Sequence, residues 1–393
     1  MATSGTAQPW VPLAGQSHRL ALEVLRHGPL SRAELARRTD LSAGSLTRLT
    51  KPLVEAGLLV EAGPLVEAGL LGEAGPGDPR RGRPAQPLDI VPDAHHFVGV
   101  KVTGDAVHGV VTTLRAEVVA SAARPLAGRT PAEVADVVAE IVDDLAARVA
   151  AVTAVGVSIG GHVLPDGTVQ RAPFLGWTDV PLTALLQDRT ARPVVAANDV
   201  LALTEATHWF GEGRGHDQFA VVTVGAGVGL GVVAHDRLLT GPNAGLGLLG
   251  HHLLDPLGPL CPQGHRGCAT AMLTTGSIER QVAAARGDSV PYDDVLDLAE
   301  AGDELARHVV DDAGRALGRL VAVVSNIALP EVVVLGGEGA RLADVARAAL
   351  DTGLTGGLDP LAVPPELAVQ VSGFDAWARG AAVIAIQTYV LGA

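Results

Sequence analysis

The chain has 393 residues, 48% of them apolar and only 3% aromatic, so it can form two or three domains around cores of Val, Leu and Ala. No apolar run approaches the roughly 20 residues of a membrane span, and residues 1–16 lack the basic and apolar regions of a signal peptide. Two cysteines argue against a disulfide-stapled secreted protein. We therefore expect a cytoplasmic protein without a membrane partner.

The net charge of −14 is unevenly distributed along the chain. Residues 1–90 carry 10 basic and 9 acidic side chains, whereas the remainder carries 19 basic and 34 acidic ones. Within the first part, residues 17–52 hold seven basic and three acidic groups. This distribution is compatible with nucleic-acid binding by the N-terminal part alone.

The N-terminal part predicts three short helices. Residues 1–16 are rich in Gly, Ser, Thr and Pro, and we expect them to be disordered. A helical pattern begins at Ser17 and is stopped by Gly28-Pro29. Ser31-Arg32-Ala33-Glu34 has the pattern of a capping box, and Ser42 caps a third helix. Helices joined this tightly predict a helix-turn-helix.

The third helix is the expected recognition helix, and Pro52 should bend or break it after Lys51. Its inward face would carry Leu46, Leu49 and Leu53. The side chains expected to contact DNA are Ser45, Thr47, Arg48 and Lys51. The alternative is a three-helix interaction module with a solvated basic face.

A tandem repeat follows, in which Leu53–Pro64 recurs as Leu65–Pro76 with one mismatch in twelve positions. The first copy resembles winged-helix domains, where the chain leaves the recognition helix and enters a β-hairpin wing. The second copy adds two Glu and no basic residue, which predicts a lengthened wing or an extended helix end. Beyond it, we expect Arg81 and Arg83 to enter a narrow A·T-rich minor groove. Residues 17–90 therefore predict a winged helix-turn-helix with a duplicated wing segment.

Residues 91–393 predict an α/β body. We expect strands at 97–102, 107–114, 154–159 and 331–335, and helices at 131–151, 204–209, 303–324 and 377–390. This order of elements resembles the actin-like ATPase fold, in which two lobes surround a cleft. The last helix is expected to return to the first lobe.

Polar and glycine-rich segments follow the buried strands of the body. Asn198-Asp199 ends an apolar strand, and α/β folds bind ligands at such strand ends. Gly161 follows strand 154–159, and Val221–Gly231 combines a strand with a glycine-rich turn that lets a ligand approach the backbone. These segments predict a small-molecule pocket.

A metal clip is predicted by His251 followed by Cys261 and Cys268. Combined with Gly225–Gly229, Gly250-His251 and Leu175–Leu182, this motif resembles the ROK family of sugar kinases and related transcriptional repressors. The resemblance runs from about Phe97 to the C-terminus.

The resemblance implies a structural zinc held by His251, Cys261 and Cys268. The family has a further Cys where this chain has Gln263, so His265 or a water would be the fourth ligand. A free-thiol loop held by packing and a disulfide between the two cysteines are the alternatives.

The resemblance also implies that kinase activity is lost. Family kinases bind ATP phosphate at Asp-x-Gly-Gly-Thr, which is Lys101–Asp105 here, and Gly225–Gly227 lacks a hydroxyl donor. Asp199 matches the catalytic base, and we expect this vestigial base to accept hydrogen bonds from ligand hydroxyls, with no ATP as cofactor. The alternative is a helix N-cap made by Asn198 or Asp199.

The sugar contacts of the family are reduced in this chain. Leu248 and Thr270 replace two Glu residues, and Phe174 replaces an Asn. The expected ligand residues are Asn198, Asp199, His251 and Gly161. Their ligand would be a modified, larger or less polar molecule than a free hexose, or there would be none.

We therefore expect a ROK-family transcriptional regulator, a repressor, that binds a double-stranded operator as a homodimer or homotetramer. Its kinase-like body would sense a small-molecule effector. The alternatives are a divergent sugar kinase and a ligand-independent DNA-binding protein with a vestigial cleft.

Overall fold

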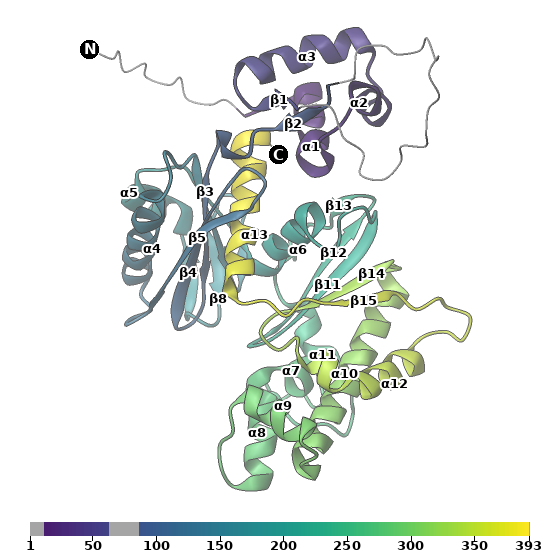
Figure 1. Cartoon of the computed structure of the whole chain (residues 1–393). Coiled ribbons are helices and arrows are strands. Elements are labelled where there is room, and N and C mark those ends of the chain that lie inside the picture. The colour runs from purple at the N-terminus through teal and green to yellow at the C-terminus, as the bar shows by residue number, and fades with distance from the viewer. Residues whose placement is uncertain (1–11, 63–85, 393) are drawn as a thin grey trace.

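The computed structural model describes residues 12–62 and 86–392, which form an N-terminal head above a two-lobed body (Figure 1). The head comprises α1 (Gly15–His27), α2 (Arg32–Thr39), α3 (Ala43–Glu55), β1 (Leu59–Glu61) and β2 (Leu88–Ile90). The predicted capping box at Ser31 is confirmed, and the Ser42 hydroxyl accepts the N–H of Ser45 at the start of α3. Of the N-terminal residues expected to be disordered, 1–11 lie outside the described residues, and α1 begins two residues before Ser17.

We predicted a bend or a break after Lys51, and the break is wrong, because α3 continues through Pro52 to Glu55. Proline removes one backbone hydrogen bond, but the helix ends one turn later, so few further bonds depend on it. The next turn stays helical, since the N–H of Ala56 donates to the Pro52 carbonyl at 2.9 Å. Burial of Leu53, which is 4% exposed, holds this last turn against the core of the head.

The wing is an antiparallel hairpin in which Leu59 lies opposite Ile90. Within the first copy of the repeat the chain leaves α3, turns and enters β1, so this copy does not extend the helix. The second copy, with Arg81 and Arg83, lies outside the described residues.

The body contains two sheets with the same topology. Their strand orders are β5-β4-β3-β6-β10 in the first lobe and β13-β12-β11-β14-β15 in the second, so each has an antiparallel meander followed by two parallel strands. A three-stranded sheet, β7-β8-β9, flanks the first lobe. This repetition confirms the two-lobed, actin-like expectation.

The elements from the start of the body to the end of β10 are η1 (Pro92–Ala94), β3 (Phe97–Val102), β4 (Ala106–Thr112), β5 (Val118–Pro125), α4 (Pro131–Ala146), β6 (Ala154–Ile159), β7 (His162–Val163), β8 (Val169–Ala172), β9 (Trp177–Val180), α5 (Leu182–Thr190) and β10 (Val194–Asn198). Those that follow are α6 (Asp199–Phe210), β11 (Gln218–Val224), β12 (Val228–Ala234), β13 (Arg237–Leu238), η2 (Leu248–His251), α7 (Ala269–Leu273), α8 (Thr275–Arg286), α9 (Tyr292–Glu300), α10 (Glu304–Ala328), β14 (Val332–Gly336), α11 (Leu342–Val345), α12 (Arg347–Gly357), β15 (Glu366–Val369) and α13 (Phe374–Ile386), which ends in a π-helical turn (Gln387–Leu391). None of the helices in the described ranges is long and apolar enough to cross a membrane.

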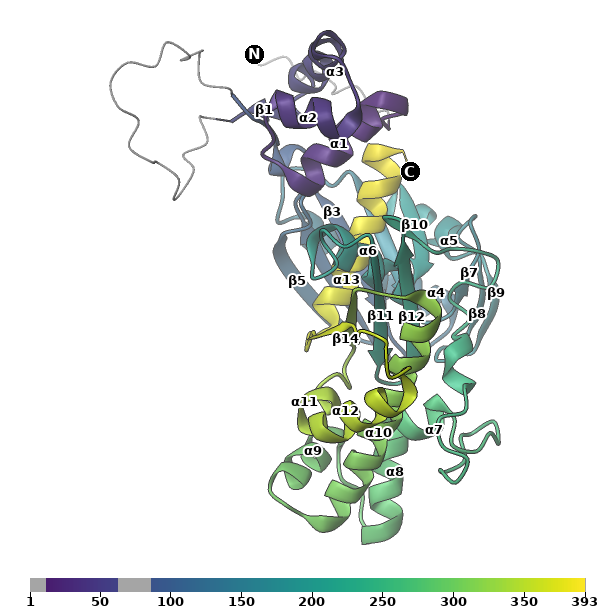
Figure 2. The ribbon, with the colours of Figure 1, turned by 90° about the vertical axis from the view of Figure 1, so that its right-hand side faces the viewer.

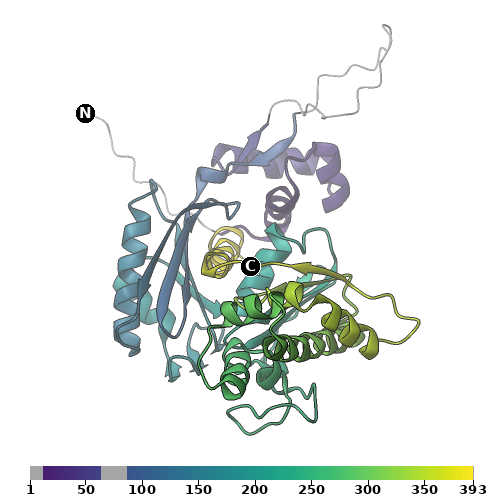
Figure 3. The ribbon, with the colours of Figure 1, turned by 60° about the horizontal axis from the view of Figure 1, so that its bottom comes forward.

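Helix α13 returns to the first lobe as predicted and lies between its sheet and α6 (Figure 3). Glycines allow the close approach: a Cβ on Gly99 of β3 would lie 2.0 Å from the Ala378 carbonyl oxygen. On its other side, a Cβ on Gly380 would lie 2.8 Å from the backbone of Ala202 in α6. Larger side chains at these glycines would therefore force α13 away from the sheet or from α6.

The head is packed directly on the body. One apolar cluster joins Leu20 and Val24 of α1 to Trp209 of α6 and Ile386 of α13. The N–H of Leu13 also donates to the Val390 carbonyl, near the end of the chain, at 3.0 Å. Figure 2 shows the C-terminal end of α13 directed toward the head, and Trp209 near the end of α6 belongs to the same apolar cluster. The orientation of the head therefore depends on these two helices.

We predict that His27, at the end of α1, makes the folded chain less stable below neutral pH. Burial, followed by the positive charges of Arg26, Arg38 and Arg214, lowers the pKa of His27 from 6.5 to about 4. Between these values the unfolded chain binds a proton that the folded chain does not. The stability contributed by neutral His27 is therefore full above pH 6.5 and is lost as the pH falls toward 4, with a loss of about 1–2 kcal/mol by pH 5.

Urea unfolding at pH 7.5 and pH 5 tests this prediction. His27→Gln should reduce the pH effect, whereas the control His308→Gln, at a side chain that is 76% exposed, should not. An unchanged pH effect in His27→Gln would contradict the assignment.

Candidate functional site

The strand-end carboxylate Asp199 forms a buried ion pair with Lys101. Lys101 Nζ, from β3, donates to Asp199 Oδ2 at the first residue of α6 and lies 4.9 Å from the ring centroid of Trp377 on α13. The two residues are 6% and 8% exposed. Asp199 Oδ1 accepts the N–H of Val200 at 2.9 Å and the amide of Asn198 at 3.2 Å. The charge and hydrogen-bonding capacity of Asp199 are therefore satisfied within the protein.

Asn198 is the N-cap of α6. Its Oδ1 accepts the N–H of Leu201 at 3.1 Å, and its Nδ2 donates to the carbonyl of Gly161 at 2.9 Å. A Cβ on Gly245 would lie 2.9 Å from the Asn198 Cβ, so the loop that leads to His251 also reaches this point. The structure thus gives Asn198 the N-cap position and brings Asn198, Asp199 and Gly161 together.

Phe174 lies against glycine turns from both lobes. A Cβ on Gly160 would lie 3.2 Å from the Phe174 ring and 3.3 Å from Asp199 Oδ2, and a Cβ on Gly227 would lie 3.7 Å from the same ring. The ring is therefore next to the buried ion pair. A phenyl ring offers no hydrogen bond to a ligand hydroxyl, so an apolar group now covers this part of the site.

The Glu338 side chain is hydrogen-bonded to the glycine turn that follows β11. Its Oε1 accepts the N–H of Ala226 at 2.7 Å, and a Cβ on Gly225 would lie 2.2 Å from its carboxyl carbon. Backbone N–H groups in glycine-rich turns are suited to bind phosphate. Here a carboxylate takes that position, and its negative charge would repel a phosphate group.

The expected metal-binding residues form a cluster on the loop between η2 and α7. The donor atoms of His251, Cys261 and His265 lie within 4.8 Å of one another. His251 Nδ1 is 3.9 Å from Cys261 Sγ and 3.7 Å from Cys268 Sγ, and His265 Nδ1 is 3.5 Å from Cys261 Sγ. Tetrahedral zinc would place a sulfur and a nitrogen ligand about 3.6 Å apart, which follows from its usual bond lengths. Both thiols are free, so the structure contradicts the disulfide alternative.

The two thiols differ in their electrostatics. Although burial opposes its ionisation, hydrogen bonds from the backbone at His265 and Gln263 and from the His265 ring lower the pKa of Cys261 to about 7. Burial raises the pKa of Cys268. A thiolate is the metal-binding form of cysteine, so Cys261 is the more readily available ligand at neutral pH.

Two family models cover almost all of the described chain. One, described as the ROK family, matches residues 97–388, and one described as the MarR family matches residues 12–64. The chain belongs to the ROK family.

Similarity to regulators spans the head and the ROK domain. The DNA-binding transcriptional dual regulator NagC of Escherichia coli K12 is 27% identical over 329 residues, which are 80% of this chain and 78% of NagC. A crystal structure of a ROK family transcriptional regulator, described as a homologue of the E. coli MLC protein, superposes with a TM-score of 0.80 at 25% identity and covers 96% of both chains. The glucokinase of Thermotoga maritima is 36% identical, but over 208 residues that make up 49% of this chain and 65% of the enzyme.

Helix α3, the predicted recognition helix, lies on the outer side of the MarR-type head, away from the ROK domain (Figures 1 and 2). On α3, Thr47, Arg48 and Lys51 are exposed and Ser45 is half-buried. Lys51 Nζ is 3.7 Å from a Glu55 carboxylate oxygen in an exposed pair. Arg48 has no ion-pair partner in the described part of the chain.

A hydrogen-bonded ion-pair network links the head to the ROK domain. Arg26 of α1, which is 5% exposed, donates twice to the Asp236 carboxylate at 2.8 Å, and its Nη2 lies 3.0 Å from His208 Nε2. The Arg26 hydrogen bonds lower the pKa of Asp236 to about 2. His208 belongs to α6, which begins at Asp199, and Asp236 follows β12, which begins after Gly227. Helix α6 therefore runs from the buried ion pair to the head, and β12 runs from the glycine turn beside Phe174 toward Asp236.

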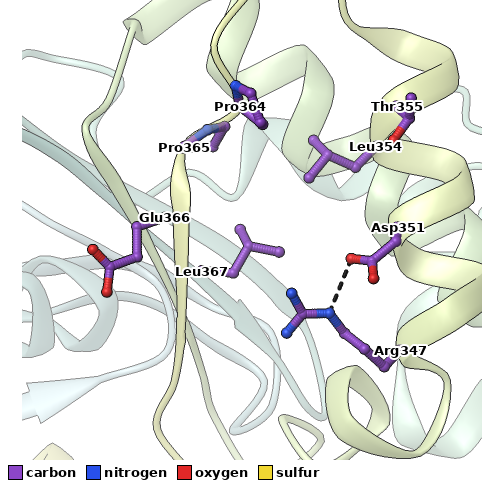
Figure 4. A pocket seen from close by; sticks show the side chains of 8 residues that line it. All are labelled: Arg347, Asp351, Leu354, Thr355, Pro364, Pro365, Glu366 and Leu367. Carbon is purple, nitrogen blue, oxygen red and sulfur yellow. Dashed lines mark hydrogen bonds and ion pairs between the residues drawn. The ribbon is translucent and has the colours of Figure 1, made fainter.

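Away from these residues, a cavity of about 410 Å³ lies between α12 and the edge strand β15 (Figure 4). Of its three charged residues, Arg347 and Asp351 pair with each other at 2.9 Å, and Glu366 belongs to β15. None of the predicted site residues lines it, so we assign it no part in the site.

Two contacts of the site were not expected from the sequence. The sequence shows that Lys101 replaces an acid of the family kinases. The pairing of Lys101 with Asp199 depends on how β3 and α6 are placed in space, which the sequence does not show. Arg26 is 182 residues from His208 and 210 from Asp236, and no local pattern indicates such contacts.

We predict that Lys101→Met destabilises the chain by about 3–5 kcal/mol, because it leaves the buried Asp199 carboxylate without a cation. Lys101→Met with Asp199→Asn should recover most of this loss, since both charges are then removed. Urea unfolding measures both effects, and Lys51→Met is the matched control at an exposed lysine. A single variant as stable as the wild type would show that the pair carries no structural role.

Proposed function

We propose that this chain is a transcriptional repressor that binds an operator through α3 and the wing. The observation that carries the proposal is an outward-facing recognition helix whose Arg48 has no ion-pair partner among the described residues. Arginine in the major groove can donate two hydrogen bonds to guanine, so an exposed and unpaired Arg48 is suited to reading bases. Thr47, Lys51 and Ser45 would complete the contacts to bases and phosphates.

We infer that the ROK domain is not a kinase. Catalysis would require Asp199 to accept a proton from a substrate hydroxyl, but Lys101 already holds its carboxylate. The Glu338 carboxylate accepts the hydrogen bond of the Ala226 N–H, which is then not available to a phosphate. Near the turn after β3, Lys101 stands where the family kinases have an acid that binds Mg²⁺. These features leave neither a free base nor a phosphate cradle, and we expect no use of ATP.

We propose that the ROK domain binds a small-molecule effector beside Asn198, Asp199, Gly161 and His251. The presence of Phe174 favours a ligand with an apolar part, such as a modified sugar. A ligand that changes the spacing of the lobes would move α6 and β12, and these elements meet Arg26 of the head. Effector binding would then alter the position of the DNA-binding helices.

The proposed active form is a homodimer or homotetramer in the cytoplasm. A symmetric oligomer presents two α3 helices to two half-sites, so its operator would be a pseudo-palindrome. The free thiols of Cys261 and Cys268 accord with a reducing compartment.

We predict that purified protein enriches a small set of pseudo-palindromic sites from sheared genomic DNA at near-physiological salt. Arg48→Ala should weaken binding to an enriched site by about 1–3 kcal/mol, because a base contact is lost. Arg81→Ala with Arg83→Ala should weaken binding and reduce the preference for A·T pairs. Titration of labelled DNA measures these effects.

The control for these variants is Arg280→Ala on α8, at the end of the body remote from the head (Figure 1). It should bind DNA like the wild type. Uniform, salt-sensitive binding to all DNA by the wild-type protein would contradict the proposed regulator.

We propose that His251, Cys261 and Cys268 hold a structural zinc ion, with His265 as the fourth ligand. The mutual distances of the His251, Cys261 and His265 donor atoms and the 3.7 Å from Cys268 Sγ to His251 Nδ1 support this set, and two sulfur and two nitrogen donors suit zinc. The ion would fix the loop that carries His251 and so shape the effector side of the ROK domain.

We predict about one zinc ion per chain in protein purified without chelators. Cys261→Ser should abolish stoichiometric zinc and His265→Ala should weaken its retention, whereas Gln263→Ala should retain it, because Gln263 is not among the proposed ligands. Metal analysis by mass spectrometry measures the content. Wild-type protein without stoichiometric zinc would refute the proposal.

A further inference from the structure

An arginine-rich cavity of about 230 Å³ lies between the head and the ROK domain. Its lining comes from α1, from the β4–β5 turn, from the end of α6 and the loop after it, and from α13, and consists of Leu25, Arg26, Arg115, Glu117, Phe210, Arg214 and Arg379. Four guanidinium groups and one carboxylate thus surround a space smaller than the roughly 300–1,000 Å³ of drug-sized ligand pockets.

Two of these arginines each pair with one carboxylate and keep one unpaired donor. Asp236 pairs with Arg26, and Asp89 pairs with Arg115. In each case the buried Nε has no hydrogen-bond partner within the described residues. These two Nε groups are enclosed by the protein, so they add positive polarity beside the cavity and not a hydrogen bond to its content.

The other two arginines have no carboxylate within ion-pairing distance in the described ranges. Arg379 donates through Nε to the Ala116 carbonyl at 2.7 Å, and burial lowers the pKa of its guanidinium. Arg214 is exposed at the loop after α6, and none of its side-chain nitrogens forms a bond within the described residues. With Asp236, Asp89 and Glu117 counted against the four arginines, one positive charge remains uncompensated.

We propose that this cavity binds a small oxyanion of the phosphate class, either inorganic phosphate or the phosphoryl group of a small phosphomonoester. Planar guanidinium groups donate paired hydrogen bonds to phosphate oxygens. Several arginines around one small space therefore suit a phosphate group better than they suit a ligand with a single carboxylate. The bound anion would bridge Arg26 of the head to Arg379 and Arg115 of the ROK domain. It would therefore strengthen the attachment of the head, at a place distinct from the effector site beside Asp199.

Titration calorimetry at constant ionic strength tests the proposal on the full chain. Inorganic phosphate and glycerol phosphate are the two probes, and tighter binding of one identifies whether the free ion or the ester is preferred. We expect saturable binding at one site per chain, weakened at least fivefold by Arg214→Gln. This side chain has no partner to lose, so the variant should fold normally. The matched control is Arg280→Gln on α8, which should leave the affinity unchanged.

Saturable binding that Arg214→Gln weakens and Arg280→Gln does not would support the site. Absence of saturable binding to both probes, or equal binding by the two variants and the wild type, would overturn it. The test does not use DNA, so its failure is distinguishable from a failure of the proposed repressor function. If the bridge forms, phosphate should also raise the melting temperature of the wild type more than that of Arg214→Gln.

Discussion

The buried pair of Lys101 and Asp199 is the interaction on which the arrangement of the two lobes depends. It joins β3 of the first lobe to the first turn of α6, beneath Trp377 of α13. Desolvation of two charges is expensive, so the pair stabilises the fold only while both partners remain. The same pairing occupies the Asp199 carboxylate, so the contact that joins these elements also underlies the proposal that Asp199 does not act as a catalytic base.

Helix α6 connects this pair to the head. Its N-terminus is capped by Asn198 beside the ion pair, and its C-terminal half presents His208 to Arg26. A helix is stiff along its axis, so a shift at one end is carried to the other. The continuous apolar cluster shared by α1, α6 and α13 makes the head part of the same packed unit rather than a tethered domain. This geometry supports a regulator in which ligands at either end of α6 alter the position of α3.

In the glycine-rich turn after β11 and beside Asp199, side chains of the chain itself lie next to the predicted ligand residues. In the turn after β11, the Glu338 carboxylate accepts the Ala226 N–H, a donor that a phosphate would otherwise be able to use. Phe174 similarly covers the position next to Asp199 with an apolar ring. Both changes replace external ligands by groups of the chain itself. The proposed anion site at the head differs, because its arginines keep donors that the described chain does not use.

Local patterns in the sequence determined the capping box at Ser31, the N-cap of α3 at Ser42 and the clustering of His251 with its two cysteines, whereas the two-lobed body was expected from the resemblance to the actin-like fold. These features follow from short-range hydrogen bonding, from apolar periodicity and from motif spacing. Only the tertiary structure decided that α3 continues through Pro52, because burial of Leu53 offsets the lost hydrogen bond. It also decided the partners of Lys101, Arg26 and Glu338, since each pairs with a group more than 90 residues away in sequence. Contacts between charges at such separations arise from the packing of whole elements and leave no periodic signal in the chain.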